Sequence, residues 1–311
     1  MKIYINRKPI KGPWGGGNKT LTALVNQLQK KHQIVYNLQP DIDIIFCFDP
    51  RHNGEGIWYQ DFINYKIKYP KVKIVQRVGD VGTHSKPELN TLLKKIVTLG
   101  FTDHFIFPSI WSKKMIDHRD KNFTHIPNAP LKEFYSARKL KKSKIENSSI
   151  KIVTHHWSNN KKKGFAIYEK LGLYAKENNI DFHYYGRYSE KYSKDGISIH
   201  EPIDAKKLID VLPYHDIYVT ASIEEAGANH VLEAMACGIP VFYHVAGGSI
   251  SEYCKDYGIA YKDFDELIDK IHIVKENYKK FYDKNMLYND NIENVIEKYV
   301  KAIERVHNEK S

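Results

Sequence analysis

The chain has 311 residues, of which 42% are hydrophobic and 27% charged, so it is longer than one ordinary domain and is not a disordered chain. Its net charge of +11 favours an anionic partner such as phosphate, nucleic acid or an acidic membrane surface, although lysines spread along the chain are more typical of a solvated surface. No apolar run reaches the roughly 20 residues that span a bilayer, no signal-peptide core is present and the three cysteines lack metal-type spacing, so we expect a cytoplasmic protein, with peripheral membrane contact left open.

Short apolar runs in the first part of the chain predict buried strands at 2–5, 44–48, 73–78 and 104–108. Between them, residues 20–31 and 87–98 carry apolar side chains at helical spacing. This alternation predicts a parallel sheet that helices cover on both faces. A basic stretch with a Ser/Asn cluster at 137–151 is the predicted linker.

A second alternation follows the linker. It predicts strands at 150–156, 180–186, 197–201, 216–222, 240–245 and 258–261, with helices at 165–177, 205–212 and 229–237. Residues 263–307 are expected to be helical throughout. The pattern predicts two doubly wound α/β domains, at 1–140 and 146–285, and a C-terminal helix at 286–311 that returns to the first domain.

The first predicted strand leads into the glycine loop GPWGGGNKT, residues 12–20. Glycine allows a close approach of backbone to a ligand, and the amides at a helix start attract anions. A nucleotide-triphosphatase P-loop needs glycine directly before its lysine, whereas Asn18 precedes Lys19 here. That class is therefore excluded, and two alternatives stay open for the loop: a flexible turn or a phosphate contact.

In an open parallel sheet, ligands bind at the carboxyl ends of the strands. The loop THHWSNNKKKGF, residues 154–165, follows such an end and precedes a helix. Lys163 at this helix entrance could neutralise a diphosphate together with backbone amides. A KKKG run taken alone is more often solvated surface, so its position after the strand is what favours a ligand.

The segment SIEEAGANHVLEAMACGIPVFYHVAGGSISEY, residues 222–253, contains two carboxylates seven residues apart. Glu225 lies in the loop after a predicted strand, and Glu233 lies one turn inside the next helix. The small residues between them leave amides accessible to a phosphate at the positive end of that helix. A single glutamate here would be read as solvent-exposed, whereas two that bracket an amide-rich loop predict one common site.

Residues 222–252 resemble the E-x7-E region of glycosyltransferase family 4, a retaining family among the group 1 glycosyl transferases. GPWGGGNKTLTAL is similar to its N-terminal glycine loop, FPSIWSKK and HIPNAP to the end of its first domain, and HHWSNNKKKGF to its donor-phosphate loop. The resemblance implies the GT-B fold. In that fold two Rossmann-like domains face each other across a cleft and the C-terminal helix packs back on the N-terminal domain.

The resemblance also implies residue roles. Glu225 would be the catalytic carboxylate that holds donor-sugar hydroxyls near the reacting carbon, Glu233 would hold the ribose hydroxyls, and Lys163 would bind the diphosphate. Further donor contacts would come from Gly16, Gly17, His156, Gly227, Ala228 and Asn229. The family often places an arginine six residues before the Lys-Gly pair, where this chain has Trp157, so Arg187 is the candidate for the missing charge.

The implied activity is retaining, hexosyl-type transfer from a UDP- or GDP-sugar to a glycan, lipid-linked or protein acceptor. Preorganised amides and Lys163 can stabilise the leaving diphosphate without metal, and no DxD-like cluster follows a strand, so we expect neither metal nor cofactor. A two-carboxylate glycosidase does not fit, because one of the two acids is assigned to ribose.

Arg77, Asp80 and His84 follow an N-terminal strand in QRVGDVGTH and are predicted on the acceptor side. An ion pair between Arg77 and Asp80, with His84 as loop surface, is the open alternative. Two other classes of function also stay open: a catalytically silent nucleotide-sugar-binding module and a basic nucleic-acid-binding protein. Because the chain has neither an RNP-type strand nor a zinc pattern, nucleic acid is not the expected partner.

Overall fold

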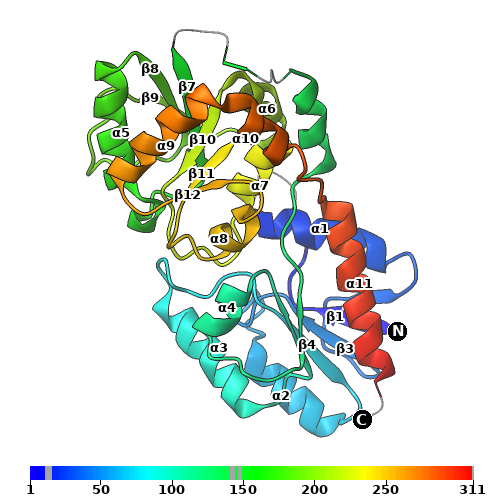
Figure 1. The fold of residues 1–311 in the computed structure, drawn as a ribbon. Helices are drawn as coiled ribbons and strands as arrows, with labels where there is room; N and C mark the ends of the chain where they lie inside the picture. Colours follow the sequence, from blue (N-terminus) through cyan, green and yellow to red (C-terminus); the bar gives the residue numbers. More distant parts are fainter. Residues whose placement is uncertain (11–15, 141–143, 146–148, 310–311) are drawn as a thin grey trace. The chain divides into compact units, whose positions relative to one another are not determined.

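The computed structural model describes residues 1–10, 16–140, 144–145 and 149–309, and the chain divides into two compact units (Figure 1). The N-terminal unit comprises Met1–Asn128 and Ile292–Ser311, and the C-terminal unit comprises Ala129–Asn291. The 3-10 helix η1 (Lys132–Leu140), part of the predicted N-terminal domain, belongs to the C-terminal unit because its Phe134 and Ala137 are buried in that core. Parts of the predicted linker, 141–143 and 146–148, lie outside the described residues.

Six parallel strands form the sheet of the N-terminal unit, in the order β2-β1-β3-β4-β5-β6. They are β1 (Lys2–Ile5), β2 (Gln33–Val35), β3 (Ile44–Cys47), β4 (Lys73–Arg77), β5 (His104–Phe107) and β6 (Phe123–His125). All four residues of β3 and of β5 are buried, as expected of strands that helices cover on both faces. The four predicted strands are confirmed, whereas the three-residue strands β2 and β6 were not predicted.

The helices of this unit are α1 (Gly16–Leu28), α2 (Tyr59–Lys68), α3 (Pro87–Leu99), α4 (Ile110–Met115) and α11 (Ile292–Asn308). Although α11 ends the chain, it packs against α1 and β4 of the N-terminal unit (Figure 1). Its buried Tyr299 meets the ring of Phe46 edge-on, with centroids 6.4 Å apart. The predicted return of the C-terminal helix is therefore confirmed.

The sheet of the C-terminal unit also has six parallel strands, in the order β12-β11-β10-β7-β8-β9. They are β7 (Ile150–His156), β8 (Ile180–Gly186), β9 (Ser198–His200), β10 (Ile217–Thr220), β11 (Val241–His244) and β12 (Ile259–Tyr261). Each coincides with a predicted strand. The two parallel sheets confirm the predicted α/β class with one doubly wound sheet in each half.

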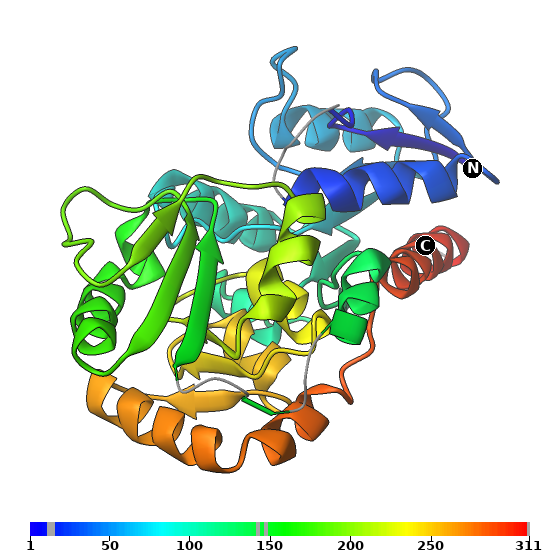
Figure 2. The ribbon, with the colours of Figure 1, turned by 90° about the horizontal axis from the view of Figure 1, so that it is seen from above.

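Helices cover both faces of this second sheet. They are α5 (Phe165–Glu177), α6 (Ala205–Val211), α7 (Asn229–Ala236), α8 (Ser249–Cys254), α9 (Phe264–Glu276) and α10 (Tyr278–Asn285). Successive strand residues point to opposite faces, so Ile217 and Val219 of β10 enter one hydrophobic cluster and Tyr218 enters the other. Figure 2 shows α5 and α9 on one side of the strands and α6 on the other.

The strand order changes direction between β1 and β3 in the N-terminal unit and between β7 and β10 in the C-terminal unit. Ligands of open parallel sheets bind at the carboxyl ends of the strands beside such switch points. The loops after these four strands are therefore where the fold itself favours a binding site. Among the described residues, no helix has the length and apolarity needed to cross a bilayer.

Candidate functional site

Two loops meet at the switch point of the C-terminal unit. The first contains the 3-10 helix η2 (Lys161–Lys163), after β7, and the second follows β10. The amide of Ile223 donates to the carbonyl of Lys162 at 2.9 Å, and the amide of Glu225 donates to the carbonyl of Gly247 at 3.1 Å. These backbone bonds fix both loops to each other and to the turn after β11.

Lys163 and Glu225 form an ion pair across the two loops. Their side chains are 11% and 14% exposed, so little water screens the pair. The neighbouring pair of Lys162 and Glu224 is more exposed. The sequence-predicted diphosphate residue and the predicted catalytic carboxylate are thus in direct contact.

Gly164 makes this contact possible. Its φ of +84° is left-handed, and a Cβ at this position would lie 2.3 Å from the carbonyl oxygen of Ala221. Only glycine accepts both conditions. The residue therefore lets the Lys163 loop lie directly on the end of β10.

Glu233 is held by His155 at the end of β7. The Oε2 atom of Glu233 lies 2.9 Å from Nε2 of His155, and the two side chains are 12% and 10% exposed. The hydroxyl of Tyr218 accepts from the His155 amide at 3.1 Å and lies 3.1 Å from its Nδ1. The same hydroxyl donates to the carbonyl of His155 at 3.3 Å, so Tyr218 contacts both backbone groups of His155 at the end of β7.

His156 faces the inside of the protein. It is 3% exposed, and its Nε2 lies 2.7 Å from the hydroxyl of Tyr168. That hydroxyl accepts the amide of Ala221 at 2.9 Å, so its proton is available to His156. Burial raises the pKa of Tyr168 to about 12, which keeps the phenol protonated at neutral pH. His156 is thus linked through Tyr168 to the chain after β10, and the donor contact predicted for it stays a prediction.

The amides at the start of α7 differ in their partners. Ala228 donates its amide to Oγ of Ser249 at 3.0 Å, so this group is already engaged within the protein. The helix begins without a side-chain cap, and Asn229 is its first residue. The positive end of the helix dipole therefore lies beside Gly227 and Asn229.

Arg187 lies against the residue that replaces the family's arginine. Its guanidinium carbon is 4.9 Å from the ring centroid of Trp157. The amide of Arg187 donates to the carbonyl of His156 at 3.2 Å. Gly186, with φ +130°, permits this approach, because a Cβ there would lie 1.9 Å from that carbonyl oxygen. Arg187, the predicted substitute for the family's arginine, thus lies beside Trp157, the position where the family often has that arginine.

The N-terminal glycines begin α1, where Gly16 and Gly17 are its first two residues. A Cβ on Gly17 would lie 4.0 Å from the ring of Phe48, after β3. Residues 11–15 of the glycine loop lie outside the described residues. The phosphate contact predicted for Gly16 and Gly17 stays a prediction.

The three acceptor-side residues fall in different surroundings. Arg77 is 6% exposed, and its guanidinium carbon lies 4.3 Å from the ring centroid of Phe48. Asp80 pairs with Lys86 at 3.0 Å, so the alternative ion pair between Arg77 and Asp80 is not formed. His84 is half-buried in the loop between β4 and α3.

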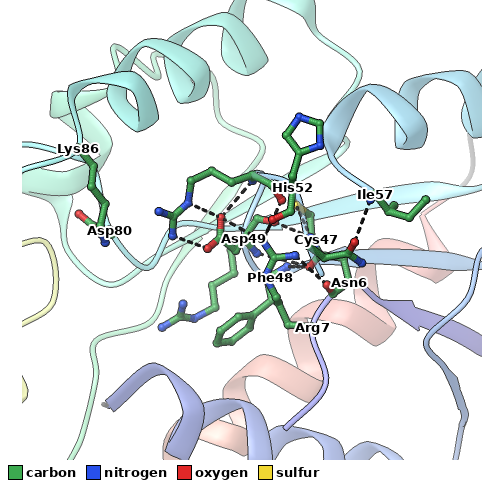
Figure 3. Close-up of polar contacts among 12 residues, drawn as sticks. Asn6, Arg7, Cys47, Phe48, Asp49, His52, Ile57, Asp80 and Lys86 are labelled. Carbon is green, nitrogen blue, oxygen red and sulfur yellow. Dashed lines mark hydrogen bonds and ion pairs between the residues drawn. The ribbon is translucent and has the colours of Figure 1, made fainter. Parts of the chain in front are cut away.

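A pocket of about 130 Å³ lies beside Arg77 at the carboxyl ends of β3 and β4. Figure 3 shows Asp49, which lines this pocket, close to Asn6 and Arg7 from the loop after β1. The side-chain oxygen of Asn6 accepts the amide of Phe48 at 2.8 Å, which fixes the chain that lines the pocket. Arg51, unlike Arg77 and Asp80, was not predicted, although the sequence DPR directly after a strand is the kind of signal used for the other loops.

The sequence predicted Glu225, Glu233 and Lys163 for the C-terminal site but not the residues that contact them in the structure. His155, Tyr168 and Tyr218 lie within or beside predicted elements, where aromatic side chains are commonly core. Among the residues that the structure describes, no three His, Cys, Asp or Glu side chains are grouped as a metal site requires.

Residues 181–294 match the family described as Glycosyl transferases group 1. A comparison with curated proteins finds no match. Among solved structures, the chain is similar to Anabaena Alr3699/HepE in complex with UDP-glucose, with a TM-score of 0.71 and 13% identity over 98% of this chain and 99% of that chain.

Two further structures are similar over nearly the whole chain. For sucrose-phosphate synthase from Thermosynechococcus elongatus, the TM-score is 0.67 and the identity 12%, over 98% of each chain. For WaaG, a glycosyltransferase involved in lipopolysaccharide biosynthesis, the TM-score is 0.68 and the identity 12%, over 97% of this chain and 99% of that chain. At these identities the similarity shows the fold, and it confirms the predicted GT-B architecture.

Proposed function

We propose glycosyl transfer from a nucleotide sugar as the activity of this chain, whose residues 181–294 match the Glycosyl transferases group 1 family and which has the GT-B fold. The observation that carries the proposal is the pairing of Lys163 with Glu225 and of His155 with Glu233 beside one switch point. Buried carboxylates held by cations or hydrogen-bond donors at such a point suit a polar ligand with both hydroxyl and phosphate groups.

The donor assignment follows from the chemistry of each group. Glu233, held by His155, accepts hydrogen bonds from the two ribose hydroxyls, since a carboxylate has two acceptor oxygens. Lys163 and the uncapped start of α7 supply positive charge for the diphosphate. UDP and GDP sugars both contain a ribose and a diphosphate. The structure of HepE in complex with UDP-glucose favours a UDP-sugar as the donor.

The chemical step requires the nucleoside diphosphate to leave as negative charge develops on it. Backbone bonds fix the loop that carries Lys163, so its ammonium group, together with the α7 amides, can stabilise that charge. Glu225 then holds hydroxyls of the transferred sugar next to the breaking bond. We propose retention by attack from the same face as the leaving group, with an acceptor hydroxyl on a glycan, lipid or protein and without a metal.

A panel of nucleotide sugars tests the proposal. UDP-, GDP- and ADP-sugars are added to the full chain, and the melting temperature is recorded for wild type and for Glu233→Gln. One of them should raise the wild-type melting temperature, because a ligand of the folded state stabilises it. Glu233→Gln should lower the affinity for that nucleotide sugar by about tenfold, since a hydrogen bond to a charged group is lost.

Turnover is measured in parallel as donor hydrolysis. Glu225→Gln should lower the turnover rate by about a hundredfold, as expected for a group that acts on the reacting part of the donor. Binding without turnover in the wild type would instead favour a silent nucleotide-sugar-binding module. No stabilisation by any nucleotide sugar would refute the proposal.

A further inference from the structure

The pocket at the carboxyl ends of β3 and β4 holds a buried cation whose charge the described protein does not neutralise. Arg77 lines this pocket and is 6% exposed. Its Nε atom is buried without a hydrogen-bond partner, and Arg77 forms no ion pair within the described part of the chain. A buried guanidinium without a counter-charge is costly, so it calls for an anion from outside.

The two acids that line the same pocket already have their own cations. Asp49 accepts from Arg51 at 2.6 and 3.0 Å and lies 3.7 Å from Arg7. Burial alone would raise the pKa of Asp49, but the hydrogen bonds and charge of Arg51, with the charge of Arg7, lower it below its usual value. Figure 3 shows this group beside the second pair, in which Asp80 contacts Lys86. Arg77 is therefore the cation left over.

The guanidinium is also held in place. Its central carbon lies over the ring of Phe48, 4.3 Å from the ring centroid, and Phe48 is in turn fixed through its amide by Asn6. A stacked guanidinium presents its N–H groups at its edge, in a fork that fits the two oxygens of a carboxylate or phosphate. The remaining walls include Val78, Leu89 and Leu93, which suit the carbon part of a ligand.

We infer that this pocket binds a compact oxyanion, a carboxylate or a phosphate ester, and that Arg77 is its receptor. The inference rests on the proposed function in one respect: the molecule that carries the anion is the acceptor. The chain would then transfer its sugar to an acidic acceptor, such as one with a uronic acid or a sugar phosphate beside the reacting hydroxyl.

Calorimetric titration of the full chain with glucuronate, glucose 6-phosphate and glucose tests the pocket. The three probes share a sugar ring and differ in their anionic group. Wild type should bind at least one of the two anionic probes about tenfold or more tightly than glucose, the effect expected of one charge-assisted hydrogen-bonded contact. Inorganic phosphate should compete with the bound probe. Equal binding of glucose and both anionic probes would overturn the inference.

Two variants test whether Arg77 causes the tighter binding of the anionic probes. Arg77→Gln removes the charge, whereas Gly79→Ala keeps it but places a Cβ 2.0 Å from Nη1 of Arg77, so the guanidinium must move. Both should abolish the preference for the anionic probe. Arg119→Gln, which removes an exposed cation from the same unit, should keep it. If both pocket variants still prefer the anionic probes to glucose, Arg77 is not the receptor for the anion. If Arg77→Gln does not fold, the result for Gly79→Ala alone decides this.

Titration with UDP and GDP separates this inference from the proposed function. Neither pocket variant should change nucleotide affinity, because Lys163, Glu225 and Glu233 belong to the other unit. Nucleotide binding without a preference for the anionic probes would remove the pocket inference alone. A preference for an anionic probe, with no nucleotide bound, would remove the proposed function and the acceptor role but leave the anion site.

Discussion

Lys163 has to exchange one anion for another if it binds the donor. In the structure its ammonium group pairs with Glu225. A diphosphate placed at the same lysine would compete with this carboxylate and be repelled by it. The residue that favours transfer thus opposes binding of the nucleotide, which helps the product nucleoside diphosphate to leave.

Glu225→Gln should therefore tighten UDP or GDP binding while it lowers turnover. We expect about a fivefold gain in affinity, which corresponds to the loss of one partly buried repulsive charge of about 1 kcal/mol. Calorimetric titration with the product nucleotide measures it.

Glu224→Gln is the matched control. It also removes a carboxylate that pairs with a loop lysine, but that pair is more exposed. Its effect on affinity should stay within about twofold, as for surface ion pairs. Weaker nucleotide binding by Glu225→Gln would show that Lys163 does not exchange partners.

At the scale of elements, the loop after β7 depends on two separate properties of Gly164. Its φ is +84°, and its Cα faces the carbonyl of Ala221 too closely for a Cβ. Gly56 has nearly the same φ, +81°, but no atom lies within 4 Å of its Cβ position. The two glycines therefore separate backbone strain from steric exclusion.

Gly56→Ala should lower the free energy of unfolding by about 1 kcal/mol, the cost of a left-handed alanine. Gly164→Ala should cost about 2 kcal/mol more, because backbone atoms of β10 must also move. Gly164→Ala should in addition weaken nucleotide binding, since Lys163 directly precedes Gly164 in the chain. Urea unfolding of both variants compares the two costs, and equal costs would contradict the steric explanation.

The last helix stabilises the unit to which it is not adjacent in sequence. Tyr299 of α11 is buried against Phe46 of β3, so Tyr299→Ala should lower the stability of the N-terminal unit by about 3 kcal/mol. Lys301→Ala, on the exposed side of the same helix, should change it by less than about 0.5 kcal/mol. Hydrogen exchange should show faster exchange in β3 and β4, with β7 and β10 unchanged. Faster exchange in β7 instead would contradict the pairing.

Sequence periodicity was sufficient for elements with a continuous apolar face. Strands β7, β10 and β11 were predicted because most of their residues are apolar and buried, and α5 because it buries one apolar face. The short strand β9 was also predicted, although none of its three residues is fully buried. Periodicity was insufficient for β2 and β6, whose three residues include exposed or polar positions. It also missed α2, where tyrosine, phenylalanine and isoleucine are poor signals of a helix.

The site shows a similar division. Glu225, Glu233 and Lys163 could be predicted because they follow strands and fit a known motif, and their roles stay predictions. His155 could not be recognised as the partner of Glu233, because the two residues are 78 positions apart and only the parallel pairing of β7 with β10 brings their elements together. Arg77 is left without a carboxylate partner because Asp49 pairs with Arg51 and Asp80 pairs with Lys86. The local sequence does not show which cation each of these acids binds.

At the scale of the whole molecule, each unit contains buried histidines whose pKa is lowered by burial, most strongly His104 and His215. In the C-terminal unit, burial and then the neighbouring His183 lower the pKa of His215 to about 3. In the N-terminal unit, burial and then Arg305 and His118 lower the pKa of His104 to about 4. In the unfolded chain both would titrate near 6.5.

Acid should therefore destabilise both units before most carboxylates titrate. Between pH 6.5 and the folded-state pKa, the unfolded chain binds a proton that the folded chain does not, so stability rises with pH across this window and is lost as pH falls. For His215, the loss is at most about 1.4 kcal/mol per pH unit. Urea unfolding at pH 7, 6 and 5 measures the slope.

Substitution of the two histidines assigns that slope to its source. His215→Asn should flatten the pH dependence of the C-terminal unit, and His104→Gln should do so for the N-terminal unit, because the group that titrates only in the unfolded chain is gone. His307→Gln, at an exposed position of α11, should leave both slopes as they are in the wild type. An unchanged slope in His215→Asn would mean that the acid sensitivity of the C-terminal unit arises from its carboxylates. In that case the stability of this unit should fall mainly below pH 5, where carboxylates begin to bind protons.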